Sequence, residues 1–347
     1  MKFGLFLEFP RGDGMTEQEA FQESFALVDE AEELGVDALW LAEYHFNQGR
    51  VLSAPITIAS AIAARTKKIR IGLAVHILPL GNPIRIAEEV ATLDHISQGR
   101  LEFGIGRGTF PNVHEGYGVP FHQSRGRFEE SLEIILKAWT TESFSFEGEH
   151  FHCKDVSVSP KPFQTPYPPV HIGITSAETF PIIGRMGYPI IINPSRVFAL
   201  SELAPHIQQY RQAWQEAGHQ GEPQVGLRVP IYVAETAERA YSDPKGSAMF
   251  SVQRLGQRVG SYATYGGTTG DWAAESKRIL GMSYEDWLRD KVAYGTSETV
   301  AEKLRQLQED LELTHIIYEI NFGNLLPYRL QIESMCRFNE EVIPQFK

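Results

Sequence analysis

Three short segments of the sequence carry side chains that could hold a phosphate group. Each segment follows a predicted strand or begins a predicted helix, where free backbone N–H groups and the helix dipole favour an anion. Their candidate ligands are Arg107, Arg125, Arg127, Thr175, Ser176 and Thr179. Taken singly, such residues are more typical of a glycine turn, surface arginines and helix caps. Their shared position indicates one anionic ligand at a common site.

Histidines are the second group of residues that could do chemistry. His76 lies just beyond the predicted strand 69–75, where it could face the mouth of a barrel. His150 and His152 lie beside Cys153, but a metal site needs three or four converging ligands, so we expect an exposed hairpin there and no metal. The sequence contains no G-x-S-x-G, H-E-x-x-H or Walker motif, so hydrolase, zinc-protease and P-loop functions have no support.

Alternating apolar strands and amphipathic helices must position these residues. The predicted strands are 3–7, 36–41, 69–75, 101–105, 170–174, 189–193, 225–234 and 315–320. The predicted helices are 17–34, 55–65, 84–96, 128–139, 179–185, 200–217, 298–310 and 326–342. Eight regular units favour an α/β fold of the closed (β/α)8 TIM-barrel type over an open doubly wound sheet. We expect a single domain over 1–347.

Two stretches interrupt this alternation. Residues 143–169 contain a predicted hairpin at 144–151 and a proline-rich loop. Residues 243–290 combine several glycines with many large apolar side chains, which is unusual for a free linker. We expect this second insertion to form a mobile lid with its tip near Gly266-Gly267. Two extra helices packed permanently on the rim are the alternative.

Composition excludes several classes of partner. The net charge is −12, without a block of basic residues, so neither nucleic acid nor an anionic membrane is an expected partner. No apolar stretch reaches the roughly 18 residues of a membrane span. Two distant cysteines and an N-terminus without signal-peptide features predict a cytoplasmic protein.

One continuous motif resembles a known family. The segment Trp40-Leu41-Ala42-Glu43-Tyr44-His45-Phe46 is similar to the W-L-x-E-H-H-F segment of bacterial luciferase and its flavin monooxygenase relatives. Other segments look like the same family: Lys2-Phe3-Gly4, Asn82-Pro83-Ile84-Arg85, Leu93-Asp94-His95-Ile96-Ser97-Gln98-Gly99-Arg100 and Phe103-Gly104-Ile105-Gly106-Arg107-Gly108. The resemblance covers nearly the whole chain except about 243–290.

The resemblance implies an FMN-dependent monooxygenase. Such an enzyme uses reduced FMN and dioxygen on an aldehyde or another small organic substrate, and the cofactor carries the hard chemistry. A separate flavin reductase would supply the reduced FMN, and the family often forms homodimers.

The resemblance also implies roles for individual residues. The phosphate of FMN would bind to Arg107, Arg125, Ser176 and Thr179. The backbone at Ala74 and Val75 would abut the flavin ring through a non-proline cis peptide. The remaining pocket residues would be Glu43, Gly106 and Thr175. The candidate catalytic residues are Tyr44 and His45 of the motif, with His45 the more structural in the family, together with His76 from its position after a strand.

Two departures from the family pattern bear on the reaction. Tyr44 stands where the family has its catalytic histidine, and Gly106 stands where luciferase has a reactive cysteine. A phenol has a pKa near about 10, so it is a poor base at neutral pH but a good hydrogen-bond donor. We therefore expect monooxygenation without light. A deazaflavin-dependent hydride transfer and a non-catalytic flavin-binding protein are the alternatives.

Overall fold

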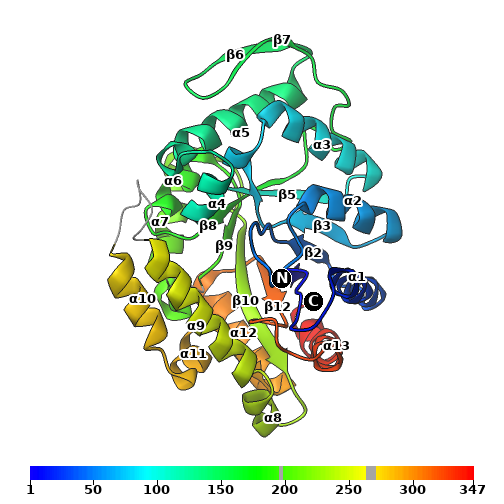
Figure 1. Ribbon diagram of the computed structural model, residues 1–347, viewed down its shortest axis with the longest axis vertical. Helices are drawn as coiled ribbons and strands as arrows, with labels where there is room; N and C mark the ends of the chain where they lie inside the picture. The colour runs from blue at the N-terminus through cyan, green and yellow to red at the C-terminus, as the bar shows by residue number, and fades with distance from the viewer. Residues whose placement is uncertain (195–197, 263–270) are drawn as a thin grey trace.

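Parallel strands close into a ring at the centre of the molecule (Figure 1). The computed structural model describes residues 1–194, 198–262 and 271–347. Within these residues, eight parallel strands each pair with two neighbours in the ring. In ring order they are β1 (Lys2–Leu7), β2 (Ala38–Leu41), β3 (Arg70–Leu73), β5 (Leu101–Gly106), β8 (Val170–Ile174), β9 (Ile190–Ile192), β10 (Val225–Val233) and β12 (His315–Glu319). The predicted (β/α)8 barrel is therefore confirmed.

The strands are almost continuously apolar because helices cover their outer side. Every residue of β10 is buried, as expected for a parallel strand with both faces covered. Two short strands extend the sheet: β4 (His76–Ile77) pairs with β5, and β11 (Ala293–Gly295) pairs with β10. The predicted strand 69–75 is thus divided into β3 and β4. The peptide between Ala74 and Val75, which separates them, is cis.

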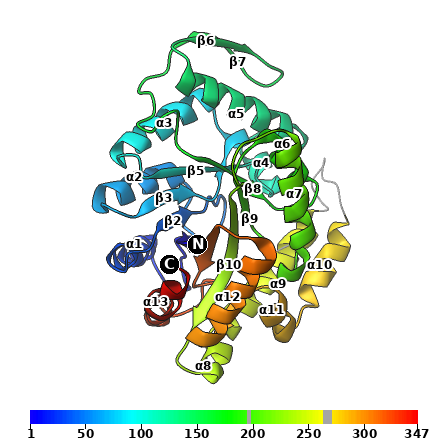
Figure 2. The same cartoon turned by 180° about the vertical axis from the view of Figure 1, so that it is seen from behind.

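The outer layer consists of helices that follow the strands. They are α1 (Glu17–Glu33), α2 (Pro55–Arg65), α3 (Pro83–Ile96), α5 (Ser124–Thr140), α6 (Thr179–Met186), α7 (Ala204–Glu216), α12 (Ser297–Leu311) and α13 (Tyr328–Arg337). Seen from behind, α12 lies over β10 (Figure 2). The start of α1 is a capping box formed by Thr16 and Glu19. Gly35, with φ of 70°, follows its end. Within the described chain, no helix is both long and apolar enough to cross a membrane.

A hairpin projects from the barrel at the top of Figure 1. It consists of β6 (Phe144–Glu147) and β7 (His152–Val156), so the prediction of a hairpin over 144–151 places its second strand too early. The carboxylate of Glu130 accepts hydrogen bonds from the backbone N–H groups of 149–151, which holds those residues in the turn. In the described part of the chain, no group of three or more His, Cys, Asp or Glu side chains could hold a metal ion.

The described residues of the 243–290 insertion form α9 (Lys245–Ser261), α10 (Trp272–Leu280) and α11 (Tyr284–Asp290). Their buried side chains make a hydrophobic cluster of their own, which includes Val252, Tyr262 and Trp287. Helices α9 and α10 are joined by a hydrogen bond, in which Ser276 Oγ donates to the carbonyl of Gly256 at 2.7 Å. The proposed movement of this insertion as a lid stays a prediction, and its tip at Gly266-Gly267 lies outside the described residues.

Candidate functional site

A cavity of about 290 Å³ opens at the carboxyl ends of the barrel strands. This is the end of a (β/α)8 barrel at which active sites form, because the loops that follow the strands converge there. All the predicted cofactor-binding residues line this cavity, namely Glu43, Ala74, Val75, Gly106, Arg107, Arg125, Thr175, Ser176 and Thr179. Tyr44 lines it as well. We call this space the flavin cavity.

One end of the flavin cavity has the donors that a phosphate group requires. Ser176 Oγ and Thr179 Oγ1 lie 2.8 Å apart where α6 begins. Arg125 lies in the first turn of α5, and Arg107 Nη1 reaches Ser124 Oγ of the same turn at 3.4 Å. Two guanidinium groups and two hydroxyls therefore line the same cavity near two helix N-termini, an arrangement that favours a dianion.

The floor of the flavin cavity is shaped by glycine. A Cβ atom on Gly106 would lie 2.5 Å from Val75 Cγ2, and one on Gly173 would lie 2.7 Å from Val75 Cγ1. Val75 can therefore occupy the floor only because both neighbours lack side chains. Apolar side chains such as Ile172 and Ile317 complete the lining. A flat apolar ring with a phosphate tail fits this combination of a smooth floor and a polar end.

A buried carboxylate, Glu43, joins two of the three predicted catalytic residues. His45 Nε2 lies 2.8 Å from its Oε1, His76 Nδ1 lies 2.7 Å from its Oε2, and the N–H of Ile77 donates to Oε2 at 3.0 Å. Burial alone would raise the pKa of Glu43, but the two histidines and the N–H together lower it to about 2. His45 and His76 do not line the flavin cavity; they hold Glu43, which does.

We expect His76 to make the stability of the fold depend on pH. Burial alone would lower the pKa of His76, but the carboxylate of Glu43 raises it above the ordinary value. The folded chain then binds more protons than the unfolded chain at pH values just above about 6.5, so the free energy of unfolding falls as the pH rises through the folded pKa. The advantage of the wild type over His76→Asn should therefore shrink in urea titrations as the pH rises from about 6.5 through the neutral and mildly alkaline range.

His152→Asn is the matched control for this experiment, because His152 is exposed on β7. Its stability should follow that of the wild type at each pH. A constant difference between the wild type and His76→Asn over this range would contradict the proposed ion pair.

Tyr44, the third predicted catalytic residue, belongs to a separate charged cluster. Its hydroxyl donates to Glu8, which also forms an ion pair with Arg50 at 2.7 Å. Burial and the charge of Glu8 raise the pKa of Tyr44 to about 12. Tyr44 is therefore a neutral hydrogen-bond donor near neutral pH and not a base.

The same charged cluster also includes Arg228 and Glu319. Arg228 Nη2 lies 2.7 Å from Glu319 Oε2 and 3.3 Å from Glu8 Oε1. Burial alone would raise the pKa of Glu8, but Arg50 and Arg228 lower it to about 2. Glu8 is therefore ionised, and its single negative charge is shared by the two guanidinium groups, of which Arg228 also pairs with Glu319.

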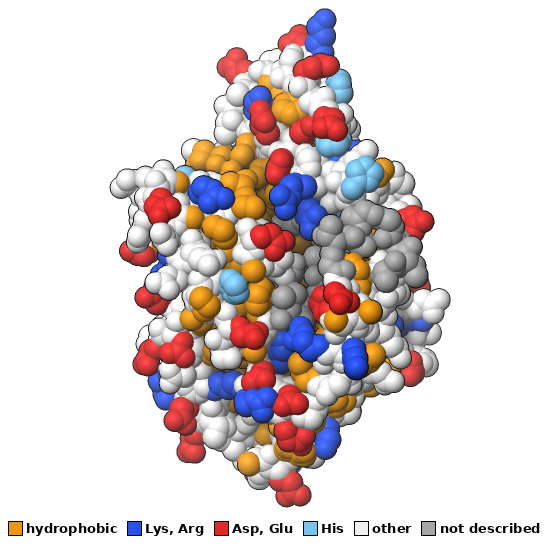
Figure 3. All heavy atoms as spheres, turned by 90° about the vertical axis from the view of Figure 1, so that its left-hand side faces the viewer, with side chains coloured by type: hydrophobic (Ala, Val, Ile, Leu, Met, Phe, Trp, Pro, Cys, Tyr) orange, Lys and Arg blue, Asp and Glu red, His pale blue; other side chains and the backbone are white. Residues whose placement is uncertain are grey.

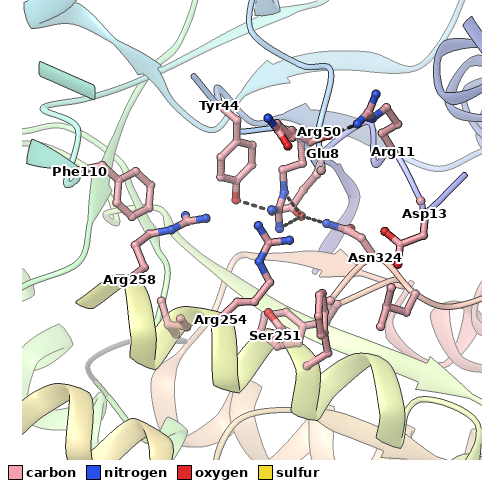
Figure 4. A pocket seen from close by; sticks show the side chains of 18 of the residues that line it. Glu8, Arg11, Asp13, Tyr44, Arg50, Phe110, Ser251, Arg254, Arg258 and Asn324 are labelled. Atoms are coloured by element: carbon pink, nitrogen blue, oxygen red, sulfur yellow. Dashed lines mark hydrogen bonds and ion pairs between the residues drawn. The ribbon is translucent and has the colours of Figure 1, made fainter. Parts of the chain in front are cut away.

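A second cavity, of about 360 Å³, adjoins the flavin cavity. The two share the lining residues Tyr44, Thr109, Phe110, Thr175, Asn193 and Arg228. One wall of the second cavity is α9, from which Arg254 and Arg258 extend toward Tyr44 and Arg50 (Figure 4). A substrate in this space would lie directly beside a cofactor in the flavin cavity, so we call it the substrate cavity.

The sequence analysis missed the charged residues that surround Tyr44. Glu8 directly follows the first apolar strand, and Arg228 lies inside an otherwise apolar strand. A charged side chain at either position signals a functional site in a barrel, so both could have been found. Arg254 and Arg258 are four residues apart, a spacing that places both side chains on one face of a helix. This spacing indicates a functional site less specifically than a charged residue in a barrel strand does.

Comparison with known proteins identifies the family. A model of the family described as luciferase-like monooxygenase matches residues 1–312, so the chain belongs to this family of flavin-dependent monooxygenases. The alkanal monooxygenase alpha chain of Photorhabdus laumondii is 31% identical over 219 residues, which are 63% of this chain and 60% of that protein. The chain thus matches three-fifths of the length of that relative.

Two solved structures share the fold. The oxygenating constituent of 3,6-diketocamphane monooxygenase of Pseudomonas putida, in complex with FMN, is 21% identical with a TM-score of 0.82, over 99% of this chain and 98% of that one. An F420-dependent secondary alcohol dehydrogenase, in complex with an F420-acetone adduct, is 17% identical with a TM-score of 0.76, over 100% and 99% of the two chains. Flavin cofactors of both types therefore occur in this fold.

Proposed function

We propose that this protein is an FMN-dependent monooxygenase that uses reduced FMN and dioxygen on an aldehyde or another small organic substrate. The observation that carries the proposal is the flavin cavity, where a phosphate-type end and a smooth glycine floor meet beside a separate substrate cavity. When bound, reduced FMN would supply the electrons that activate dioxygen. Membership of the flavin-dependent monooxygenase family supports the same reaction class.

The side chains of the site would bind and orient the reactants. Arg107 and Arg125 would hold the phosphate, and Val75 would support the ring. Glu43, fixed by its two histidines, keeps the loop that follows β2 in place against Ile77. Tyr44 would present its ring at the boundary of the two cavities, while its hydroxyl stays on Glu8. None of the described residues that line the two cavities is a histidine, which favours a reaction that needs no neutral-range base at this boundary.

A deazaflavin-dependent hydride transfer is the second candidate. The similarity of fold to an F420-dependent alcohol dehydrogenase supports it. The phosphate-type end of the flavin cavity suits either cofactor, because both carry phosphate. We favour FMN because the family model that matches is that of monooxygenases and because the compared structure with the higher TM-score holds FMN.

We also propose that a separate reductase supplies the reduced FMN. The solved neighbour that holds FMN is itself described as an oxygenating constituent, which is one part of a larger system. A homodimer as the working unit stays a prediction from the family resemblance.

A binding and oxygen-uptake experiment tests the proposed function. After incubation with equimolar FMN and F420 and removal of free ligand, absorbance and mass should identify FMN as the retained cofactor. With reduced FMN from an unrelated reductase, aldehydes or ketones should yield oxygenated product at the expense of hydrogen peroxide. We expect no light with long-chain aldehyde, because Tyr44 and Gly106 replace the residues of luciferase.

Three results would contradict this function. Retention of F420 alone would favour hydride transfer. Retention of FMN without product from any of the aldehydes or ketones would favour a non-catalytic flavin-binding protein. Bright luminescence would refute the argument from Tyr44.

A further inference from the structure

The substrate cavity carries more positive than negative charge. Its described lining contains the arginines Arg11, Arg50, Arg228, Arg254 and Arg258 but only two acidic residues, Glu8 and Asp13. Glu8 is already engaged with Arg50 and Arg228. In Figure 3, which views the molecule from the side of α9 and α10, basic side chains lie above and below the centre of the face, with acidic side chains next to them. The cavity therefore suits an anion.

Arg254 and Arg258 supply two of the three positive charges in excess. Neither forms an ion pair within 4.0 Å in the described residues, and the stretches 195–197 and 263–270 contain no Asp or Glu. Both guanidinium groups instead lie over aromatic rings, at 5.5 Å from the centroid of Phe250 and 5.0 Å from that of Phe110. These contacts direct the two groups into the cavity but leave their N–H donors available for a ligand.

Their arrangement on α9 points to a ligand. Like charges four residues apart on a helix repel each other and destabilise it. Burial and the nearby charges of Arg258 and Arg50 lower the pKa of Arg254, although the group stays protonated at neutral pH. An anion between the guanidinium groups of Arg254 and Arg258 would remove this repulsion and would accept several charge-assisted hydrogen bonds.

The lining also contains large apolar side chains, which suit an apolar body of the ligand. These apolar lining residues include Phe110, Leu255, Phe322 and Leu325, beside polar residues such as Gln48 and Ser251. A volume of about 360 Å³ lies in the range of small-molecule sites, so the body is about the size of one ring or a short chain.

We propose that Arg254 and Arg258 bind the carboxylate or phosphate group of a small organic anion, and that the substrate of this enzyme belongs to that class. The proposal rests on the function proposed above. The arginines would hold the anionic end of the molecule at α9, and its apolar body would extend past Phe110 and Tyr44 toward the flavin cavity. The two arginines are specificity residues in this scheme and are not catalytic.

Direct binding measurements test the proposal without turnover. Benzoate, hexanoate and phenyl phosphate are titrated by calorimetry into the FMN-loaded and the FMN-free protein, beside the neutral benzamide and hexanamide. The acids should bind at least about tenfold more tightly than the amides, which is the effect of one charge-assisted contact. Arg254→Gln/Arg258→Gln should abolish this preference and leave the Kd of FMN unchanged. Relative binding of benzoate and phenyl phosphate distinguishes a carboxylate from a phosphate ester.

Lys277→Gln is the matched control, because it removes one positive charge from an exposed position on α10 outside both cavities. It should keep the preference for acids. Equal binding of acids and amides by the wild type, no binding of any acid at millimolar concentration, or a preference that survives in the double variant would overturn the proposal. Loss of FMN binding in the double variant would also overturn it, because the arginines would then hold the cofactor. Failure of the wild type to bind FMN would instead count against the proposed function.

Discussion

Arg107→Ala is expected to weaken the binding of FMN at least tenfold while it leaves the binding of riboflavin unchanged. Arg107 lies at the end of the flavin cavity where Arg125, Ser176 and Thr179 also gather. A hydrogen bond to a charged group contributes about 1.5–3 kcal/mol, and each 1.4 kcal/mol is about tenfold in affinity. Riboflavin lacks the phosphate, so its binding does not depend on a contact with Arg107. Fluorescence titrations of both flavins with both proteins measure the difference.

Two further variants make this result specific. Arg125→Ala should have the same selective effect, because Arg125 lies in the first turn of α5 and also lines the flavin cavity. Lys137→Ala removes a positive charge from the exposed last turn of the same helix and should affect neither flavin. If wild-type protein binds FMN and riboflavin equally well, the phosphate does not lie where we propose.

Glu8→Ala is expected to lower the free energy of unfolding by about 3–5 kcal/mol, which is the usual cost of removing one partner of a buried ion pair. Glu8 is buried and accepts from Tyr44 and Arg50, with Arg228 at 3.3 Å. Arg228 would keep Glu319 as a partner, so most of the loss comes from Arg50. Urea denaturation of the wild type and the variant measures the change.

Controls separate charge from packing in this experiment. Glu8→Gln keeps the shape and some hydrogen bonds, so its loss should be intermediate. Glu133→Ala removes one partner of an exposed pair with Lys137 and should cost about 1 kcal/mol or less. A loss that small in Glu8→Ala would mean that water or another group compensates Arg50, and our account of the cluster would be wrong.

Local sequence patterns predicted most of the barrel. Helix α2 begins at Pro55 and ends at Arg65, as predicted, because proline suits the first turn and the apolar spacing stops at the end. The break between β3 and β4 was harder to predict, since the strand pattern continues unbroken through Ala74 and Val75. The turn of the hairpin depends on Glu130, a residue on another element, so local patterns misplaced the second strand.

The candidate site was predicted only in part, for a similar reason. The cofactor candidates lie in short motifs that each follow a strand, and the topology of a barrel brings such motifs together. The cluster around Glu8 depends on contacts with Arg50 and Arg228, which are 42 and 220 residues away in sequence. The sequence alone does not indicate which strands are neighbours or how they are aligned. It therefore does not predict that Arg50 and Arg228 contact Glu8. The direction of Arg254 and Arg258 likewise requires the position of α9 over the barrel.

The contact between Val75 and Gly106 bears on how members of this family can evolve from one another. A cysteine at position 106, as in luciferase, would place its Cβ 2.5 Å from Val75 Cγ2, a branched side chain with little freedom to move. The two positions are therefore epistatic, because a cysteine at position 106 requires Val75 to move or to be replaced by a smaller residue. Gly173 adds a second constraint on the same side chain. A change at position 75 to a smaller residue would thus make the later gain of the cysteine less costly.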